Sequence, residues 1–128
     1  MSKDFKSIIS DISASTAELR KLIPDTMNGF ATMSKAATQT KALDEKTKEL
    51  IALALSVAAH CDGCLGFHTR TLARLGASRE EVAEALGMAI YMGGGPSLMY
   101  AADALRSFDQ FSAQTGNATV AAISGGRE

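Results

Sequence analysis

The chain has 128 residues, of which 46% are hydrophobic, and its 13 basic and 14 acidic side chains give a formal net charge of −1. This length predicts a single domain spanning residues 1–128. The near-neutral charge provides no basic patch of the kind that nucleic acid requires, and the lack of tryptophan leaves no stacking platform for single strands, so we expect no nucleic-acid partner.

The N-terminal part of the chain predicts two helices. An apolar stripe at spacings of three and four residues predicts an amphipathic helix over residues 3–21. The side chains of this stripe and its continuation are Phe5, Ile8, Ile9, Ile12, Leu19, Leu22 and Ile23. Pro24 suits the first turn of a second helix, in which Met27, Phe30 and Met33 are expected to point inward.

A third helix is predicted from Asp44, a good N-cap residue, to about Ala59. Its second half is apolar nearly all round, which indicates burial either at the centre of the fold or at a subunit interface. The stretch IYMGGGPSLMYAADAL adds further apolar surface, more than six short helices can cover. We therefore expect a homo-oligomer.

The second half of the chain predicts three more helices, each marked by residues that begin or end it. Gly76 is a good C-terminal cap for the fourth helix, and S-x-x-E at Ser78–Glu81 is a capping box for the fifth. The run Gly93–Pro96 separates the fifth helix from the sixth. The expected limits are Cys61 or Asp62 to Leu75, Ser78 to Met92, and Ser97 to about Ser112. Residues 113–128 are expected to be a loose end or a short docking segment.

The predicted class is all-α, because no segment alternates with the period of a strand. The longest apolar run, LIALALSVAA, ends at His60 after ten residues, whereas a membrane span needs roughly 20. The N-terminus carries Asp4 and lacks the apolar core of a signal peptide. We therefore expect no membrane partner and a cytoplasmic location, where a C-x-x-C pair is more often catalytic or metal-binding than structural.

The reactive side chains are concentrated in HCDGCLGFH, residues 60–68, which holds both cysteines and both histidines. In a helix, Cys61, Cys64 and His68 would lie on one face, because they are three and four residues apart. A C-x-x-C pair at a helix N-terminus can lower a thiol pKa from about 8.5 toward 7. His68, one turn after Cys64, can take or relay a proton. The spacing therefore indicates an activated thiol, a second thiol to form a disulfide, and a nearby base.

Other uses of these residues stay open. Two free cysteines on a buried helix face would be ordinary core residues. Cys61, Cys64 and His68 with a carboxylate would suit zinc, but the chain lacks the second ligand pair typical of structural zinc sites. Two further uses are excluded: haem attachment would require histidine in place of Leu65, and thioredoxin-like chemistry would require strands, which the sequence does not predict.

Glu49 adds a carboxylate to this set. If the third and fourth helices form an antiparallel hairpin that turns near His60, Glu49 comes within reach of His68 but not of Cys61. A carboxylate behind a histidine fixes the tautomer of its ring. The alternative is an ordinary acid near a helix N-terminus, stabilised by the helix dipole.

Glu49, Cys61, Cys64 and His68 form the pattern E-x11-C-x-x-C-x3-H, which resembles the core motif of the carboxymuconolactone decarboxylase and alkylhydroperoxidase (AhpD-like) superfamily. The resemblance includes ALDEKTKELIALA before the motif, LARLGASREEVAEAL after it, and the break after the fifth helix, and it covers about residues 22–112. It implies an AhpD-like bundle of about six helices, assembled as trimers or hexamers, with residues 113–128 as a tail.

The activity implied by the resemblance is thiol-dependent reduction of hydroperoxides by a peroxiredoxin-type antioxidant protein. Cys64 would be the peroxidatic thiol that passes through sulfenic acid, and Cys61 would resolve it and donate a proton. Glu49 and His68 would form the proton relay. The implied partners are a hydroperoxide substrate and a dithiol or thiol-disulfide reductant, and no metal or organic cofactor is implied.

One position departs from the alkylhydroperoxidase pattern, because Gly63 stands where those enzymes have a histidine before the second cysteine. From the residues alone, the helix N-terminus favours a thiolate at Cys61, whereas His68 favours one at Cys64. The alternative functions are a protein disulfide reductase and a decarboxylase-like lyase or isomerase with His68 as the base. The decarboxylase branch of the superfamily lacks the cysteine pair.

Overall fold

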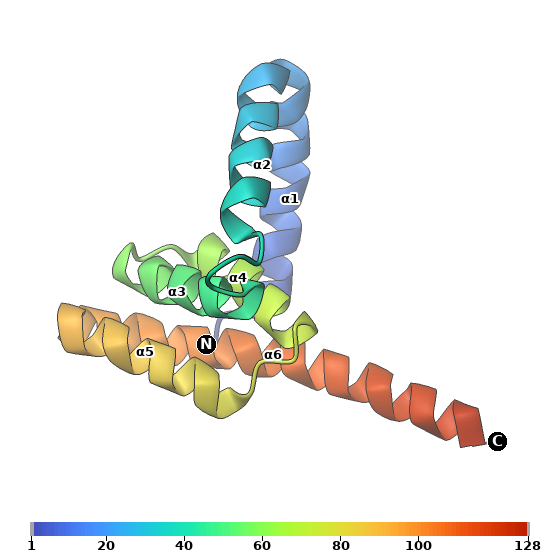
Figure 1. Ribbon diagram of the computed structural model, residues 1–128. Helices are drawn as coiled ribbons and strands as arrows, with labels where there is room; N and C mark the ends of the chain where they lie inside the picture. The colour runs from blue at the N-terminus through green and yellow to red at the C-terminus, as the bar shows by residue number, and fades with distance from the viewer. Residues whose placement is uncertain (1, 128) are drawn as a thin grey trace.

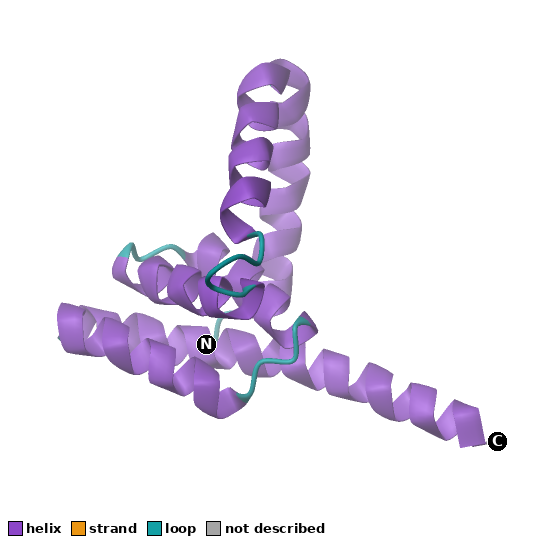
Figure 2. Ribbon diagram, viewed as in Figure 1, coloured by secondary structure: helices purple, strands orange, loops and turns teal. Residues whose placement is uncertain are grey.

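The computed structural model describes the backbone of residues 2–127 and the side chains of residues 2–113. In this part of the chain every regular element is a helix, as Figures 1 and 2 show. The order is α1 (Phe5–Leu22), α2 (Pro24–Thr38), α3 (Glu45–Ala58), α4 (Asp62–Arg74), α5 (Arg79–Gly93) and α6 (Gly95–Arg127). The predicted all-α class with six helices is confirmed. None of the described helices is long and apolar enough to cross a membrane.

Local capping residues set most of the helix limits, as the sequence predicts. The Asp44 side chain accepts a hydrogen bond from the Thr47 N–H at 2.8 Å and begins α3. Ser78 and Glu81 form both halves of the predicted capping box at the start of α5. Gly76, after α4, has a φ of 78°, a conformation that glycine adopts without steric cost.

The core lies between α3, α4, α5 and α6, and the first turns of α1 close it from the side of α4 (Figure 1). Phe5 and Ile9 are the buried residues of α1. The fully buried apolar side chains are Phe5, Leu53, Val57, Leu65, Leu72, Val82 and Ala104. Burying large aliphatic side chains is typically worth about 1.5–3 kcal/mol each, so this layer holds α4 firmly against its neighbours.

The second helix is less buried than its sequence predicts. Phe30 and Met33 were expected to point inward, but their exposed fractions are 63% and 60%, so that prediction is wrong. Figure 1 shows the reason: α2 folds back on α1, and the two project from the bundle as a hairpin. No residue of α2 is buried, and Leu22 at the tip is 77% exposed. The apolar periodicity correctly indicates an apolar face, but this face is not covered within one chain.

Two further expectations differ from the structure. The third helix is buried on one side only, since Ile51 and Leu55 are 47% and 63% exposed. Burial at the centre of the fold is therefore wrong, and burial at a subunit interface stays a prediction. The sixth helix begins at Gly95 and continues past Ser112 to Arg127. Residues after Ser112 include no proline, the strongest helix breaker, which is consistent with this extension. Docking by the tail is a prediction that lies outside the described side chains.

Candidate functional site

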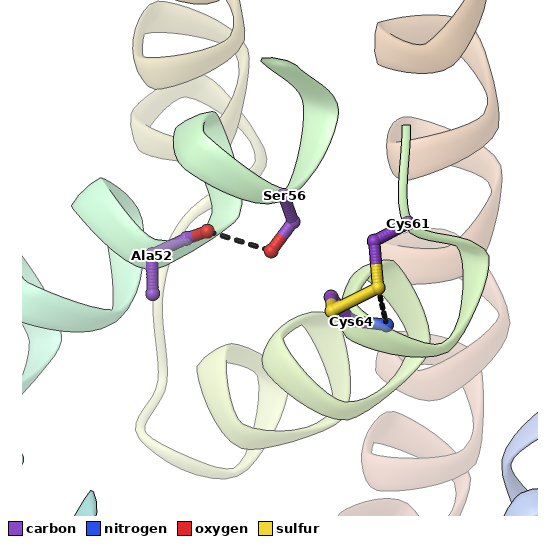
Figure 3. The surroundings of a disulfide bond; sticks show 4 residues. All are labelled: Ala52, Ser56, Cys61 and Cys64. Carbon is purple, nitrogen blue, oxygen red and sulfur yellow. Dashed lines mark hydrogen bonds between the residues drawn. A yellow bond between two sulfur atoms is a disulfide. The ribbon is translucent and has the colours of Figure 1, made fainter. Parts of the chain in front are cut away.

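The two cysteines of the chain form a disulfide at the N-terminus of α4, with an S–S distance of 2.10 Å and a Cα–Cα distance of 5.2 Å (Figure 3). Cys61 is the N-cap residue of α4, and its Sγ accepts a hydrogen bond from the Cys64 N–H at 3.2 Å. Both residues are partly exposed. Because a helix N-terminus stabilises negative charge, this contact would also stabilise a Cys61 thiolate once the bond is reduced.

The turn between α3 and α4 holds Cys61 in this position. The His60 N–H donates to the Val57 carbonyl, and the Cys61 N–H donates to the Ser56 carbonyl, both at 3.1 Å, which is the Schellman pattern at a helix C-terminus. His60 takes the left-handed place of that pattern with a φ of 56°, where glycine is usual. Ser56 is buried and donates its hydroxyl to the Ala52 carbonyl at 2.7 Å, as Figure 3 shows.

A histidine and a carboxylate form a second pair in the candidate site. Glu49 Oε2 lies 2.6 Å from His68 Nδ1, so α3 and α4 form the hairpin that the sequence predicts. The Glu49 side chain is 7% exposed and that of His68 is 32% exposed. An ionised carboxylate accepts from Nδ1–H, which leaves Nε2 as the nitrogen that can take a proton. The buried carboxylate therefore orients a histidine that is partly exposed to solvent.

The two pairs are connected through α4, which carries Cys64 and His68. The predicted site residues meet as Cys61 with Cys64 and as Glu49 with His68, and within residues 2–113 no hydrogen bond joins His68 to either sulfur. Cys64 and His68 are one helical turn apart on α4, which places them on the same face. Among the described residues, no group of three or more His, Cys, Asp or Glu side chains is arranged to hold a metal ion.

The glycine inside the C-x-x-C motif lies against α1. A Cβ atom added at Gly63 would be 2.6 Å from Ile12 Cδ1, and one added at Gly66 would be 2.3 Å from Ile9 Cγ2. Glycines one turn apart on α4 thus allow α1 to approach closely. The end of the Ile12 side chain would have to shift to make room for any side chain at position 63.

The sequence did not identify a cluster of four residues near the start of α4, which are Lys3, Asp62, Tyr100 and Asp103. Lys3 Nζ lies 3.1 Å from both carboxylate oxygens of Asp62 and 2.9 Å from Asp103 Oδ2. The same ammonium lies 5.3 Å from the ring centre of Tyr100, on which the His60 ring stacks with centroids 4.5 Å apart. Lys3 precedes Asp62 by 59 positions and Asp103 by 100, so no local motif reports these contacts.

Comparisons with a family model and with solved structures indicate the same protein family. The model of the carboxymuconolactone decarboxylase family matches residues 24–107. An uncharacterised protein from Cupriavidus necator is 43% identical over 113 residues, which is 88% of this chain and 100% of that protein.

Solved structures of the same family have the same fold. A carboxymuconolactone decarboxylase family protein from Legionella pneumophila is 58% identical, with a TM-score of 0.83 over 84% of this chain and 96% of that one. A family protein from Thermotoga maritima, for which involvement in the antioxidative response is suggested, is 27% identical, with a TM-score of 0.73 over 84% of this chain and 95% of that one.

Proposed function

The chain belongs to the carboxymuconolactone decarboxylase family and has its AhpD-like fold, and we propose that it is a thiol-dependent hydroperoxidase. The observation that supports this most is the Cys61–Cys64 disulfide one turn before a histidine that Glu49 holds. Together these residues provide a nucleophile, a resolving thiol and a base. The suggested antioxidative role of the Thermotoga maritima protein points the same way.

The proposed reaction has three steps. His68 Nε2 takes the proton of the Cys64 thiol, and the thiolate attacks one peroxide oxygen, so that an S–O bond forms as the O–O bond breaks. The departing alkoxide takes the proton back from His68 and leaves as the alcohol. Cys61 then displaces the oxygen of the Cys64 sulfenic acid, giving the disulfide and water. A dithiol reductant restores both thiols and becomes oxidised itself.

This proposal makes peroxide the oxidant that closes the disulfide. Reduced protein treated with one equivalent of hydroperoxide should lose two hydrogen atoms, and mass spectrometry should place the bond between Cys61 and Cys64. Hydroperoxides should also be consumed faster with protein and a dithiol than with the dithiol alone. Irreversible sulfonic acid on both sulfurs with no disulfide would contradict the proposal, and so would consumption no faster than the dithiol alone.

Disulfide reduction in other proteins is a second candidate, supported by the position of Cys61. Its sulfur lies at the helix N-terminus and accepts an N–H, so it would leave readily as a thiolate when an external thiol attacks Cys64. A protein disulfide substrate that is reduced at the expense of the dithiol, without any peroxide, would favour this candidate.

We also propose that the working form is a homo-oligomer, a trimer or a hexamer, in a cytoplasmic setting. The exposed apolar side chains of α3 and α5 flank a groove of about 260 Å³, and the α1–α2 hairpin has an uncovered apolar face. The groove is lined by Ala54, Leu55, Ala58, Met88, Ala89, Met92 and Gly93. Such contiguous apolar surface is typical of protein–protein contacts.

Sedimentation at micromolar concentration should therefore give three or six times the mass of one chain. Leu55→Asp should lower that mass, because it places a charge in the groove, whereas Glu84→Ala, an exposed position of α5, should leave it unchanged. A wild-type mass equal to one chain would rule out the oligomer.

A further inference from the structure

The N-terminal segment brings a fixed cation to the start of α4. The Gln110 side chain of α6 donates its Nε2–H to the Lys3 carbonyl at 3.0 Å and accepts from the Phe5 N–H at 2.9 Å. Phe5 itself is fully buried. The backbone on both sides of Asp4 is thus hydrogen-bonded to α6. These bonds fix the start of the chain where the Lys3 ammonium contacts Asp62.

Asp62 brings a negative charge next to Cys61. It is the first residue of α4, while the sulfur of Cys61 caps the same helix end. A carboxylate and a thiolate at one helix N-terminus repel each other. Both are stabilised by the same partial positive charge, which the helix dipole places at that end. A cation paired with Asp62 would reduce that repulsion.

Lys3 is the cation that pairs with Asp62 among the described residues. Asp103, the other partner of Lys3, also accepts a hydrogen bond from Arg106 Nη1 at 3.0 Å. The positive charge of Arg106, also on α6, therefore already neutralises Asp103. The hydrogen bond to Asp103, with Asp62 in support, raises the pKa of Lys3 above its ordinary value, so Lys3 stays charged at neutral pH. Its side chain is 38% exposed, so the effect of this charge is partly screened by solvent.

We infer that Lys3 is a positioning residue for the dithiol: it neutralises Asp62 beside Cys61 and thereby favours the Cys61 thiolate in the reduced protein. The inference rests on the proposed function, because a resolving thiol attacks the sulfenic acid as a thiolate. Lys3 lies before residue 24, where the family match begins, so it is a feature of this chain outside the matched region.

The ionisable groups on the elements packed around the start of α4 could each influence the titration of the cysteine pair. From the packed elements these are Lys3, Glu49, His60, Asp62, His68, Tyr100, Asp103 and Arg106. Lys3 can lose its charge by substitution without altering the relay pair or the residues that flank Cys61.

The test is the pH profile of iodoacetamide alkylation of the reduced protein, with tandem mass spectrometry to assign the modified sulfur. Lys3→Met should slow alkylation of Cys61 at pH 7 by about threefold to tenfold and move its profile to higher pH, the size expected for one partly screened charge. Lys3→Arg should stay close to wild type, because it keeps the charge. Lys6→Met, an exposed lysine on α1, is the control for the change in net charge.

A second arm separates charge from structure. In an Asp62→Asn background, Lys3→Met should slow alkylation less than in wild type, since the carboxylate to be neutralised is gone. An unchanged profile in Lys3→Met would overturn the inference, and so would equal slowing by Lys3→Arg or by Lys6→Met. Alkylation uses neither peroxide nor a reductant partner, so this result is independent of whether the protein proves to be a hydroperoxidase.

Discussion

Replacing Cys64 with serine is expected to reduce dithiol-dependent peroxide consumption to the rate of the dithiol alone. A serine hydroxyl is a far weaker nucleophile than a thiolate at neutral pH and does not form a sulfenic acid. The measurement is the rate of hydroperoxide loss at a fixed dithiol concentration, with circular dichroism to show that the helical fold is retained.

The matched variant is Cys61→Ser, which keeps the nucleophile and removes the resolving thiol. It should complete one turnover and accumulate Cys64 sulfenic acid, which a dimedone adduct would reveal by mass. If the roles are reversed, the adduct will form in Cys64→Ser instead. If an activity survives in both variants, the thiols are incidental, and a lyase or isomerase with His68 as base becomes the better description.

Replacing His68 with glutamine is expected to slow the reaction of Cys64 with peroxide by about 10²–10⁴-fold, the usual contribution of a positioned general base. Glu49→Gln should cost less, because its amide oxygen can still accept from Nδ1–H at the 2.6 Å position while the negative charge is lost. The double variant should be little slower than His68→Gln alone, since residues that act as one unit are not additive.

The measurement is the pH dependence of Cys64 alkylation and of the single-turnover peroxide rate in all variants. Glu45→Gln, one turn earlier on α3, is the control for losing an acid from that helix. Identical profiles in wild type, Glu49→Gln and His68→Gln would mean that no relay exists. The helix terminus at Cys61 would then have to account for any activation of the thiols.

Local signals explain why much of the site could be predicted from the sequence. Asp44, Ser78 and Gly76 act within one turn of their own positions, so the limits of the helices follow directly from them. The pairing of Glu49 with His68 follows from two helices of known start and end joined by a short turn. Whether these residues catalyse the proposed reaction stays a prediction for the experiments above.

Contacts between distant segments explain what the sequence did not reveal. The pairing of Lys3 with Asp62 depends on how α1 lies across α4, which helical periodicity does not report. Phe30 and Met33 show a second limit of prediction from the sequence. An apolar stripe indicates that one face of a helix is suited to burial, but it does not indicate whether the same chain or another chain buries it. Their exposure makes the hairpin a candidate contact surface for the proposed oligomer.

The close approach of Ile12 to Gly63 also makes these two positions depend on each other. Isoleucine at position 12 fills the space beside α4, so a side chain at position 63 has to displace its Cδ1 methyl group. This methyl group is the far end of a flexible side chain, so it can rotate away, and a smaller residue at position 12 would leave the space free from the start. The effect of a substitution at position 63 is therefore expected to depend on which residue stands at position 12.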